Sequence, residues 1–426
     1  MLELLSSKFI DCFASMEKGD FVVSDIEFIK YITISCAYYL SPFSFIILAL
    51  LGFIAHYLRN VVHTPALFCT NKNGFEDKLK RHLKDLDEWV WPPFWCYWGL
   101  AQSVLANMLP GPNLESIREF IFPGDGGSFS LDWFVTKEHY HDAEDKSPVV
   151  LIFPGHTGHG EKPYVRKLIA ALNDLNLRAV VFNNRGLGSN VKLHTPYMSC
   201  VARTGDMEHA IKYIDELHPG APVLVVAVSI TACMFLNYAS RIGKDILPNI
   251  VGAFLISTPW NALHAKDQLS KGLNNLIVNR HMTGEIRDII VNNKEVFDKN
   301  PQLPYNMDGI MKAKTLWDLD DAYICPMYGF KDHFEFYKYV SVDSLPLEDI
   351  CIPILALSAE DDCFCQVKMI PLDRIYKNLH FGLVITRHGG HIGFLEGFLT
   401  GSNSMTIPHK LLKDYASMLL LEQNGK

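Results

Sequence analysis

The sequence predicts an α/β fold in which helices cover both faces of a mostly parallel central sheet. From residue 116 onward, short apolar runs of strand length alternate with stretches of helical periodicity. Such alternation is typical of parallel sheets, because the chain must cross back over the sheet between consecutive parallel strands. The expected strands, of which the first two form an antiparallel start, are 120–122, 131–135, 149–153, 179–182, 223–228, 251–256, 352–357 and 381–385.

Four helices and one insertion complete this expectation. The helices are 162–172, 206–217, 230–241 and a closing helix at 410–422. Residues 260–350 contain helical patches but no strand pattern, which predicts a helical lid inserted between two strands. The aromatic residues of this lid could line an acyl pocket or simply pack on the sheet, and they are Trp317, Tyr323, Tyr328, Phe330, Phe334, Phe336 and Tyr337.

Composition narrows the function class. The chain has 426 residues, a net charge of −8 and a mean hydropathy of +0.08, and its basic residues are scattered, so we expect no nucleic-acid partner. Its 10 cysteines show no paired C-x-x-C spacing, so we expect neither a zinc site nor a disulfide framework. Nothing in the sequence calls for a cofactor, and the oligomeric state stays open.

The N-terminal part predicts a membrane anchor. After a mixed segment at 1–30, residues 31–58 contain no Asp, Glu, Lys or Arg. As a helix this stretch would be about 42 Å long, more than the ~30 Å hydrocarbon core of a bilayer, with Pro42 marking a kink or a start. We expect a single-pass signal-anchor in the endoplasmic reticulum or another internal membrane, although a buried core helix has the same pattern. The membrane side stays open, because basic residues flank the stretch evenly.

A collar at 59–115 separates this anchor from the α/β domain at 116–426, which carries the lid. Four tryptophans cluster in the collar around Pro92 and Pro93, namely Trp89, Trp91, Trp95 and Trp98. They fit an aromatic belt at a bilayer surface and equally fit a collar packed on the α/β domain.

The catalytic hypothesis begins at Ser229. An apolar strand at 223–228 ends at this serine, and a helix at 230–241 starts directly after it. This is the layout of a nucleophile elbow, in which a sharp turn lifts a hydroxyl out of the sheet edge. The usual G-x-S-x-G spacing reads Ala227-Val228-Ser229-Ile230-Thr231, so both glycines are replaced.

An acid and a base follow in the expected order. A serine hydroxyl needs a base to take its proton, and the base needs a partner that orients it. Carboxylates follow strand 352–357 at Glu360, Asp361 and Asp362. Histidines follow strand 381–385, and we favour His391, beside two glycines, over its rival His388. The order serine, acid, histidine is that of α/β-hydrolases.

The oxyanion hole should be formed by two backbone N–H groups. One follows the nucleophile and belongs to Ile230, and we assign the second to His156, in a loop with Gly155, Gly158 and Gly160 after an early central strand. The histidines of this loop have no carboxylate or cysteine at ligand spacing, so we expect no metal.

Taken together, these motifs resemble the membrane-anchored α/β-hydrolase-domain proteins, in the branch of esterases, phospholipases and acylglycerol lipases. The matching segments are Trp91-Pro92…Trp95-Cys96, Pro154-Gly155-His156-Thr157-Gly158, Asn184-Arg185-Gly186, Ser229, Asp361-Asp362 and Gly389-Gly390-His391-Ile392-Gly393-Phe394. The resemblance implies a membrane-anchored serine hydrolase that cleaves lipid carboxyl esters through Ser229, Asp362 and His391. Many members have proline after this aspartate, where the chain has Cys363.

One departure keeps alternatives open. Thr231 stands at the elbow glycine, where a β-branched side chain is expected to crowd the helix against the strand. The alternatives are a weak or inactive hydrolase-fold protein that binds lipid or a partner, and an acyltransferase on the same fold.

Overall fold

One sheet organises the computed structural model, which describes residues 42–135, 144–175, 177–189, 191–398 and 404–421. In the described part of the chain the sheet has nine strands in the order β1-β9-β8-β7-β6-β4-β5-β3-β2. The strands are β1 (Ala66–Cys69), β2 (Ile117–Ile121), β3 (Phe129–Phe134), β4 (Val149–Phe153), β5 (Arg178–Asn183), β6 (Val223–Val228), β7 (Ile250–Ile256), β8 (Ile354–Ala359) and β9 (Phe381–Thr386). The predicted α/β-hydrolase fold is therefore confirmed.

The centre of the sheet is parallel and both edges are antiparallel. Strands β4 to β9 pair in parallel, with β4 between β5 and β6. At one edge β2 pairs antiparallel with β3, as expected, and β3 pairs antiparallel with β5. At the other edge β1 pairs antiparallel with β9, so the collar contributes a strand that the sequence did not predict.

Alternating side chains of the central strands bury both faces of the sheet. In β4, Val149, Leu151 and Phe153 join one hydrophobic core, whereas Val150 and Ile152 join the other. This alternation follows from the two-residue period of a strand. Helices α7 (Gly205–Leu217) and α8 (Ile230–Ile242) cover the first face. Helices α4 (Phe75–His82), α6 (Pro163–Leu172) and α17 (Ile407–Ala416) cover the second.

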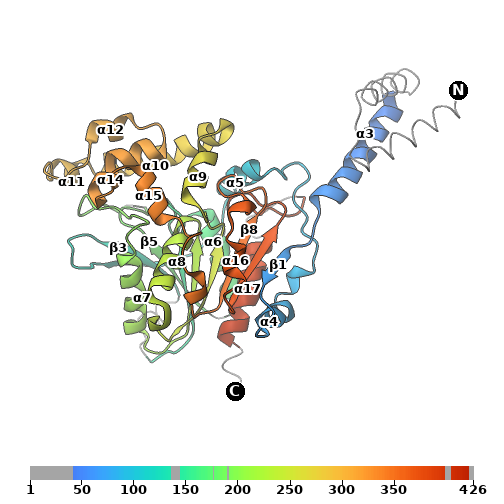
Figure 1. The fold of residues 1–426 in the computed structure, drawn as a ribbon, viewed down its shortest axis with the longest axis horizontal. Helices are drawn as coiled ribbons and strands as arrows, with labels where there is room; N and C mark the ends of the chain where they lie inside the picture. Colours follow the sequence, from blue (N-terminus) through green and yellow to red (C-terminus); the bar gives the residue numbers. More distant parts are fainter. Residues whose placement is uncertain (1–41, 136–143, 176, 190, 399–403, 422–426) are drawn as a thin grey trace. The chain divides into compact units, whose positions relative to one another are not determined.

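The lid is helical, as predicted, and has a hydrophobic core of its own. It follows β7 and precedes β8, and Figure 1 shows its helices grouped beyond one end of the sheet. They are α9 (Ala262–Leu269), α10 (Arg280–Asn292), α11 (Lys294–Asp298), α12 (Met307–Lys312), α13 (Leu316–Leu319), α14 (Cys325–Tyr328) and α15 (His333–Val340), with a π-helical turn η5 (Asn274–Asn279) before α10.

The apolar helix near the N-terminus forms a separate unit. Compact units divide the chain into Met1–Asn60 and Val61–Lys426. Within the described residues, one helix, Phe43–Val61, is both long enough and apolar enough to cross a membrane. The mean hydropathy of its most apolar window is 1.6. This segment consists of α3 (Pro42–His56) after its first residue and of a π-helical turn at Tyr57–Val61. Residues 31–41 of the predicted anchor lie outside the described residues.

Candidate active site

The carboxyl ends of four strands, β4, β6, β8 and β9, bring the predicted residues to one edge of the sheet. The parallel register pairs Phe153 of β4 with Ala227 of β6, and Val228 of β6 with Ile256 of β7. Farther along, Ala359 of β8 pairs with Thr386 of β9. The loops after these strands therefore start side by side, as in other open parallel sheets whose sites lie at this edge.

Ser229 occupies a strained turn between β6 and α8. Its backbone has φ 58° and ψ −124°, a region that non-glycine residues rarely adopt. The N–H of Ser229 donates to the carbonyl of Ile256, 2.8 Å away, which fixes the turn to the neighbouring strand. In the described residues the other non-glycine positive φ angles belong to Ser257, Ile392 and Phe394, all in loops at this same edge.

A continuous hydrogen-bonded chain joins the three residues that the sequence singled out. The hydroxyl oxygen of Ser229 lies 2.8 Å from Nε2 of His391. On the other side of the ring, Nδ1 of His391 lies 2.9 Å from Oδ2 and 3.1 Å from Oδ1 of Asp362. Both the imidazole and the carboxylate are buried, with side chains 7% and 2% exposed, so bulk water competes little for these contacts.

The loop around Asp362 orients the carboxylate. Its Oδ1 accepts hydrogen bonds from the backbone N–H groups of Phe364, at 2.7 Å, and Cys365, at 3.2 Å. The ring of Phe364 also packs against the imidazole of His391, with ring centroids 4.0 Å apart. A proline at this position would have no backbone N–H and a fixed φ angle, whereas Cys363 has neither restriction. The thiol of Cys363 contacts the hydroxyl of Ser103 at 3.9 Å.

The neighbouring Asp361 and His388 form a second pair. Nδ1 of His388 lies 3.0 Å from Oδ2 of Asp361. The other carboxylate oxygen of Asp361 accepts hydrogen bonds from the N–H groups of Gly389 and Gly390, at 3.0 and 2.8 Å. Asp361 and His388, the alternatives to Asp362 and His391, therefore bind each other, and Asp361 holds the loop that carries His391.

Ile230 and His156 line one cavity together with Ser229. Ile230 is the first residue of α8, so its N–H has no partner within the helix, and the positive end of the helix dipole lies here. His156 and Ser229 line the same cavities, and the preceding Gly155 amide is already used, since it donates to the hydroxyl of Tyr164 at 2.9 Å. Of these two loop residues, His156 therefore stays the candidate oxyanion donor.

Thr231 fits the elbow without the expected crowding. Its side chain is 1% exposed, and its hydroxyl lies 2.7 Å from the carbonyl of Phe153 and 2.9 Å from that of Val228. The same oxygen accepts a hydrogen bond from the N–H of Val228 at 3.1 Å. The hydroxyl therefore ties α8 to the ends of β4 and β6, a compensation that the spacing alone did not reveal.

The collar helix α5 (Gly99–Met108) supports His391. The sequence did not predict this support. The N–H of His391 donates to the hydroxyl of Ser103 at 2.7 Å, and that hydroxyl donates to the carbonyl of Gly99 at 2.8 Å. A Cβ on Gly99 would lie 2.1 Å from the carbonyl oxygen of Asp361, and one on Gly390 would lie 2.0 Å from the carbonyl oxygen of Gly99. Both glycines are needed for this close approach of two backbones.

Two cavities meet at Ser229. The larger, of about 470 Å³, also contains His391, Lys162 and Glu285 and extends along α5. The smaller, of about 100 Å³, is an apolar chamber under the lid. Of the seven lid aromatics predicted for an acyl pocket, Phe336 and Tyr337 line this chamber.

One buried carboxyl group lies in the wall of the apolar chamber. Oδ2 of Asp320 accepts a hydrogen bond of 2.6 Å from the hydroxyl of Tyr337. Burial raises the pKa of Asp320 to about 7, and the charge of Asp321 adds to the shift, whereas the Tyr337 hydrogen bond opposes it. The carboxyl group of Asp320 can therefore take up a proton near neutral pH, because apolar surroundings favour its uncharged form.

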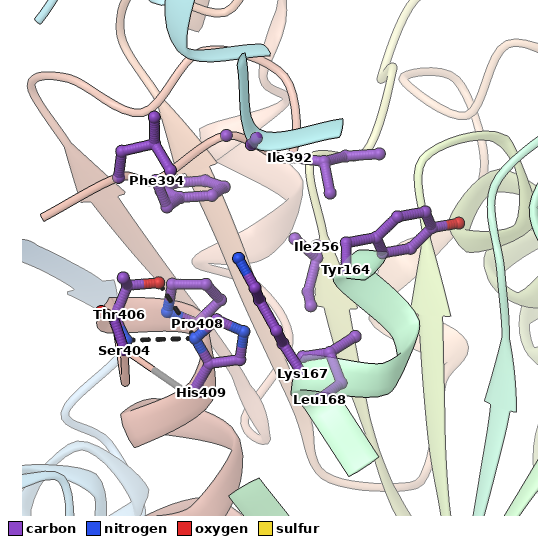
Figure 2. Close-up of a pocket in the computed structure, with 13 residues that line it drawn as sticks. Tyr164, Lys167, Leu168, Ile256, Ile392, Phe394, Ser404, Thr406, Pro408 and His409 are labelled. Atoms are coloured by element: carbon purple, nitrogen blue, oxygen red, sulfur yellow. Dashed lines mark hydrogen bonds between the residues drawn. The ribbon is translucent and has the colours of Figure 1, made fainter. Parts of the chain in front are cut away.

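A third cavity lies beneath the loop that follows His391 (Figure 2). Its volume is about 30 Å³, and it is lined by Lys167, Ile392 and His409 among others, but not by Ser229. Figure 2 shows the ammonium of Lys167 pointing into it. Burial lowers the pKa of His409 to about 3, and the ring caps the start of α17 by accepting from the N–H of Thr406. The role of His409 is thus structural.

No candidate metal centre emerges from the described ranges. Within them, three or more His, Cys, Asp or Glu side chains nowhere gather at metal-binding distances. His159 of the glycine-rich loop instead faces Glu161, 3.6 Å away.

Known proteins resemble this chain over most of its length. A family model described as "Serine aminopeptidase, S33" matches residues 144–324. Human phospholipase ABHD3 is 33% identical over 345 residues, which cover 80% of this chain and 82% of that protein. Human monoacylglycerol lipase ABHD2 is 23% identical over 356 residues, covering 80% and 82%. Among solved structures, mouse α/β-hydrolase domain-containing protein 10 has a TM-score of 0.43 at 10% identity, covering 73% of this chain and all of that one. With a relative this similar over four fifths of its length, the chain belongs to the α/β-hydrolase-domain (ABHD) family of serine ester hydrolases.

Proposed function

We propose that this protein is a membrane-anchored serine hydrolase that cleaves carboxyl esters of lipids. The names of its relatives, phospholipase and monoacylglycerol lipase, support a lipid ester as substrate, either a phospholipid or an acylglycerol. The observation that carries the proposal is the unbroken contact chain from the hydroxyl of Ser229 through the ring of His391 to Asp362.

The proposed reaction starts with the attack of the Ser229 oxygen on the ester carbonyl, while Nε2 of His391 removes the hydroxyl proton. Asp362 orients the ring and stabilises the imidazolium that forms. The N–H groups of Ile230 and His156 bind the negative charge on the carbonyl oxygen. His391 then gives its proton to the leaving alcohol oxygen, and an acyl-enzyme remains. Water, activated by the same histidine, releases the carboxylic acid and restores Ser229.

The two cavities suggest how a lipid ester would lie. The apolar chamber under the lid suits the acyl chain, because its lining residues include Leu269, Ile324 and Phe336. The larger cavity suits the alcohol part of the ester, since it offers Lys162 and His281 beside apolar side chains. Ser229 lies where the two meet, as cleavage between the acyl and alcohol parts requires.

The apolar helix suits a single-pass anchor. Phe43–Val61 has 19 residues, or about 28 Å of helix, which is close to the hydrocarbon thickness of a bilayer. Only 6% of its most apolar window is buried, unlike a core helix. We propose the endoplasmic reticulum or another internal membrane as its location.

A fluorophosphonate probe tests the proposal, because it reacts with an activated serine. The full chain in detergent should be labelled, and Ser229→Ala should abolish labelling with the fold retained. Ser240→Ala is the matched control, since Ser240 is on the same helix and its hydroxyl donates to the Asn237 carbonyl within that helix. Lipid profiling of cells that express wild type or Ser229→Ala then identifies the ester. An unlabelled wild type would contradict the proposal, and a dominant transfer product with an added alcohol would indicate an acyltransferase.

A further inference from the structure

The collar exposes an unusual number of large apolar side chains. We define the collar surface as Trp89, Trp95, Trp98, Met108 and Phe398, of which Trp89, Trp98 and Met108 are 58%, 59% and 74% exposed. Phe398 belongs to the loop after His391 but joins this surface, because its carbonyl accepts a hydrogen bond of 3.0 Å from the indole of Trp95. Large apolar patches on a soluble surface mark interaction sites.

Charge is missing from the same stretch. Residues 89–114 contain no Asp, Glu, Lys or Arg, although 20% of the whole chain is charged and a run of this length would carry about five such residues. Because this stretch has no charged side chain, none of its own residues has an ion to desolvate when it meets an apolar phase. Tryptophan is also the residue that accumulates at the headgroup level of membranes.

Backbone pairing holds this stretch beside the point where the apolar helix ends. His63 and Val90 form an antiparallel bridge, in which the N–H of Val90 donates to the carbonyl of His63 at 2.7 Å. Trp89 flanks Val90, and His63 follows Val61, the last residue of the apolar helix, by two residues. Two extended residues span about 7 Å, so an inserted helix would leave Trp89 close to the bilayer surface.

Helix α5, which starts directly after Trp98 and ends at Met108 of the collar surface, also lines the reaction cavity. Val104, Asn107 and Met108 of α5 line the larger cavity together with Ser229. Across the cavity, the lid contributes Ile277, which is 40% exposed. A lipid that leaves a bilayer under the collar would therefore reach the serine along α5.

We propose that the collar surface docks onto the headgroup layer of a phospholipid bilayer and holds the mouth of the larger cavity against it. The hydrolase unit then has a membrane contact of its own, distinct from the helix Phe43–Val61. The proposal deepens the proposed function and rests on it for the identity of the substrate, since docking matters for catalysis only if the ester resides in the bilayer.

Tryptophan fluorescence tests the docking itself, independently of any activity. The full chain is placed in phosphatidylcholine vesicles whose lipids carry bromine near the headgroup end of the acyl chains, where bromine quenches nearby indoles. Four of the seven tryptophans are in the collar, Trp133 and Trp260 are fully buried, and Trp317→Phe removes the seventh. We expect Trp95→Phe and Trp98→Phe each to lower the amount of tryptophan fluorescence that the brominated lipid quenches. If both variants leave the quenched fluorescence unchanged, lipid contacts neither Trp95 nor Trp98 and reaches only residues beside the apolar helix. That result would overturn the proposal.

Kinetics provide the second readout. Trp95→Ser/Trp98→Ser should lower the hydrolysis of a vesicle-borne ester by roughly tenfold or more, with hydrolysis of the water-soluble 4-nitrophenyl butyrate unchanged. Phe120→Ser/Phe122→Ser, which alters exposed aromatics at the other edge of the sheet, is the matched control. Equal losses on both esters would overturn the proposal.

Two further outcomes separate the possible failures. A wild type inert toward every ester and the probe contradicts the proposed function, and the quenching result alone then decides on docking. Dimerisation that depends on Trp95 and Trp98, without quenching by brominated lipid, overturns the proposal and assigns the surface to a second copy of the chain.

Discussion

The backbone N–H of His391 donates a 2.7 Å hydrogen bond to the hydroxyl of Ser103, which lies 288 residues earlier in the chain. The proposed catalytic base is therefore positioned partly by a helix outside the predicted hydrolase domain. The Ser103 hydroxyl binds the backbone of His391, whereas the ring nitrogens of His391 face Ser229 and Asp362, so its effect on the proposed reaction acts through the position of the histidine.

We expect Ser103→Ala to lower kcat toward a soluble ester about tenfold with little change in KM, because a loosened imidazole spends less time aligned with Ser229. Ser103→Thr keeps the hydroxyl and should recover most of the loss. Steady-state kinetics with 4-nitrophenyl butyrate measure both variants. A rise in KM at constant kcat would instead indicate that Ser103 merely shapes the cavity.

Asp362→Asn and Asp361→Asn should behave differently, although the two residues are adjacent. Asp362→Asn removes the negative charge that orients His391 and should lower kcat by about a thousandfold or more. Asp361→Asn mainly weakens the loop bonds to Gly389 and Gly390, so we expect a drop of about 1–2 kcal/mol in stability and a modest loss of rate. Thermal unfolding and ester kinetics on both variants distinguish the effects, and the reverse pattern would make Asp361 the catalytic acid.

Thr231→Gly restores the usual elbow residue but should not restore activity. The glycine loses the hydroxyl bonds to the carbonyls of Phe153 and Val228, so we expect a destabilisation of about 1–3 kcal/mol. Thr231→Ser keeps the hydroxyl and should stay close to wild type. Unfolding temperature and turnover of a soluble ester measure the two changes. A large gain of turnover in Thr231→Gly would favour the weak or inactive lipid-binding alternative for the native chain.

Asp320→Asn should stabilise the protein at high pH. An unfolded aspartate ionises near pH 4, whereas burial raises the pKa of Asp320 to about 7, so the folded state holds the proton more tightly. The contribution of this proton to the free energy of unfolding is fully present below pH 4 and is lost as the pH rises through 7. Asparagine does not ionise, so the variant should exceed wild type by about 1–4 kcal/mol at pH 8 and match it near pH 4. Unfolding temperatures across this range test the trend, with the exposed Asp308→Asn as control. A constant difference would contradict it.

Much of the site was predictable because each candidate follows an apolar strand. Ser229 comes directly after β6, and Asp362 and His391 lie in the loops that follow β8 and β9. Parallel strands bring their carboxyl ends to one edge. The contribution of Ser103 was not predictable. A serine on a helix has no motif, and the partner of its hydroxyl is far away in sequence.

The errors in the predicted fold also have physical causes. Strand β1 has only four residues and is defined by its pairing with β9 rather than by a pattern of its own. The strand expected at 352–357 begins at Ile354 instead, because Pro353 has no N–H to give to the ladder. The closing helix starts at Ile407 rather than 410, since Thr406 and His409 cap it reciprocally.

The contact between Gly99 and Gly390 limits how the protein can be shortened for expression. A recombinant fragment that begins at residue 116 would omit α5 and β1, leaving the β9 backbone uncovered and the histidine loop without its supporting hydroxyl. Such a fragment should express poorly or purify inactive even though it retains all three proposed catalytic side chains. A fragment that begins at Val61 keeps the whole second compact unit and is the better choice for crystallisation or inhibitor screening.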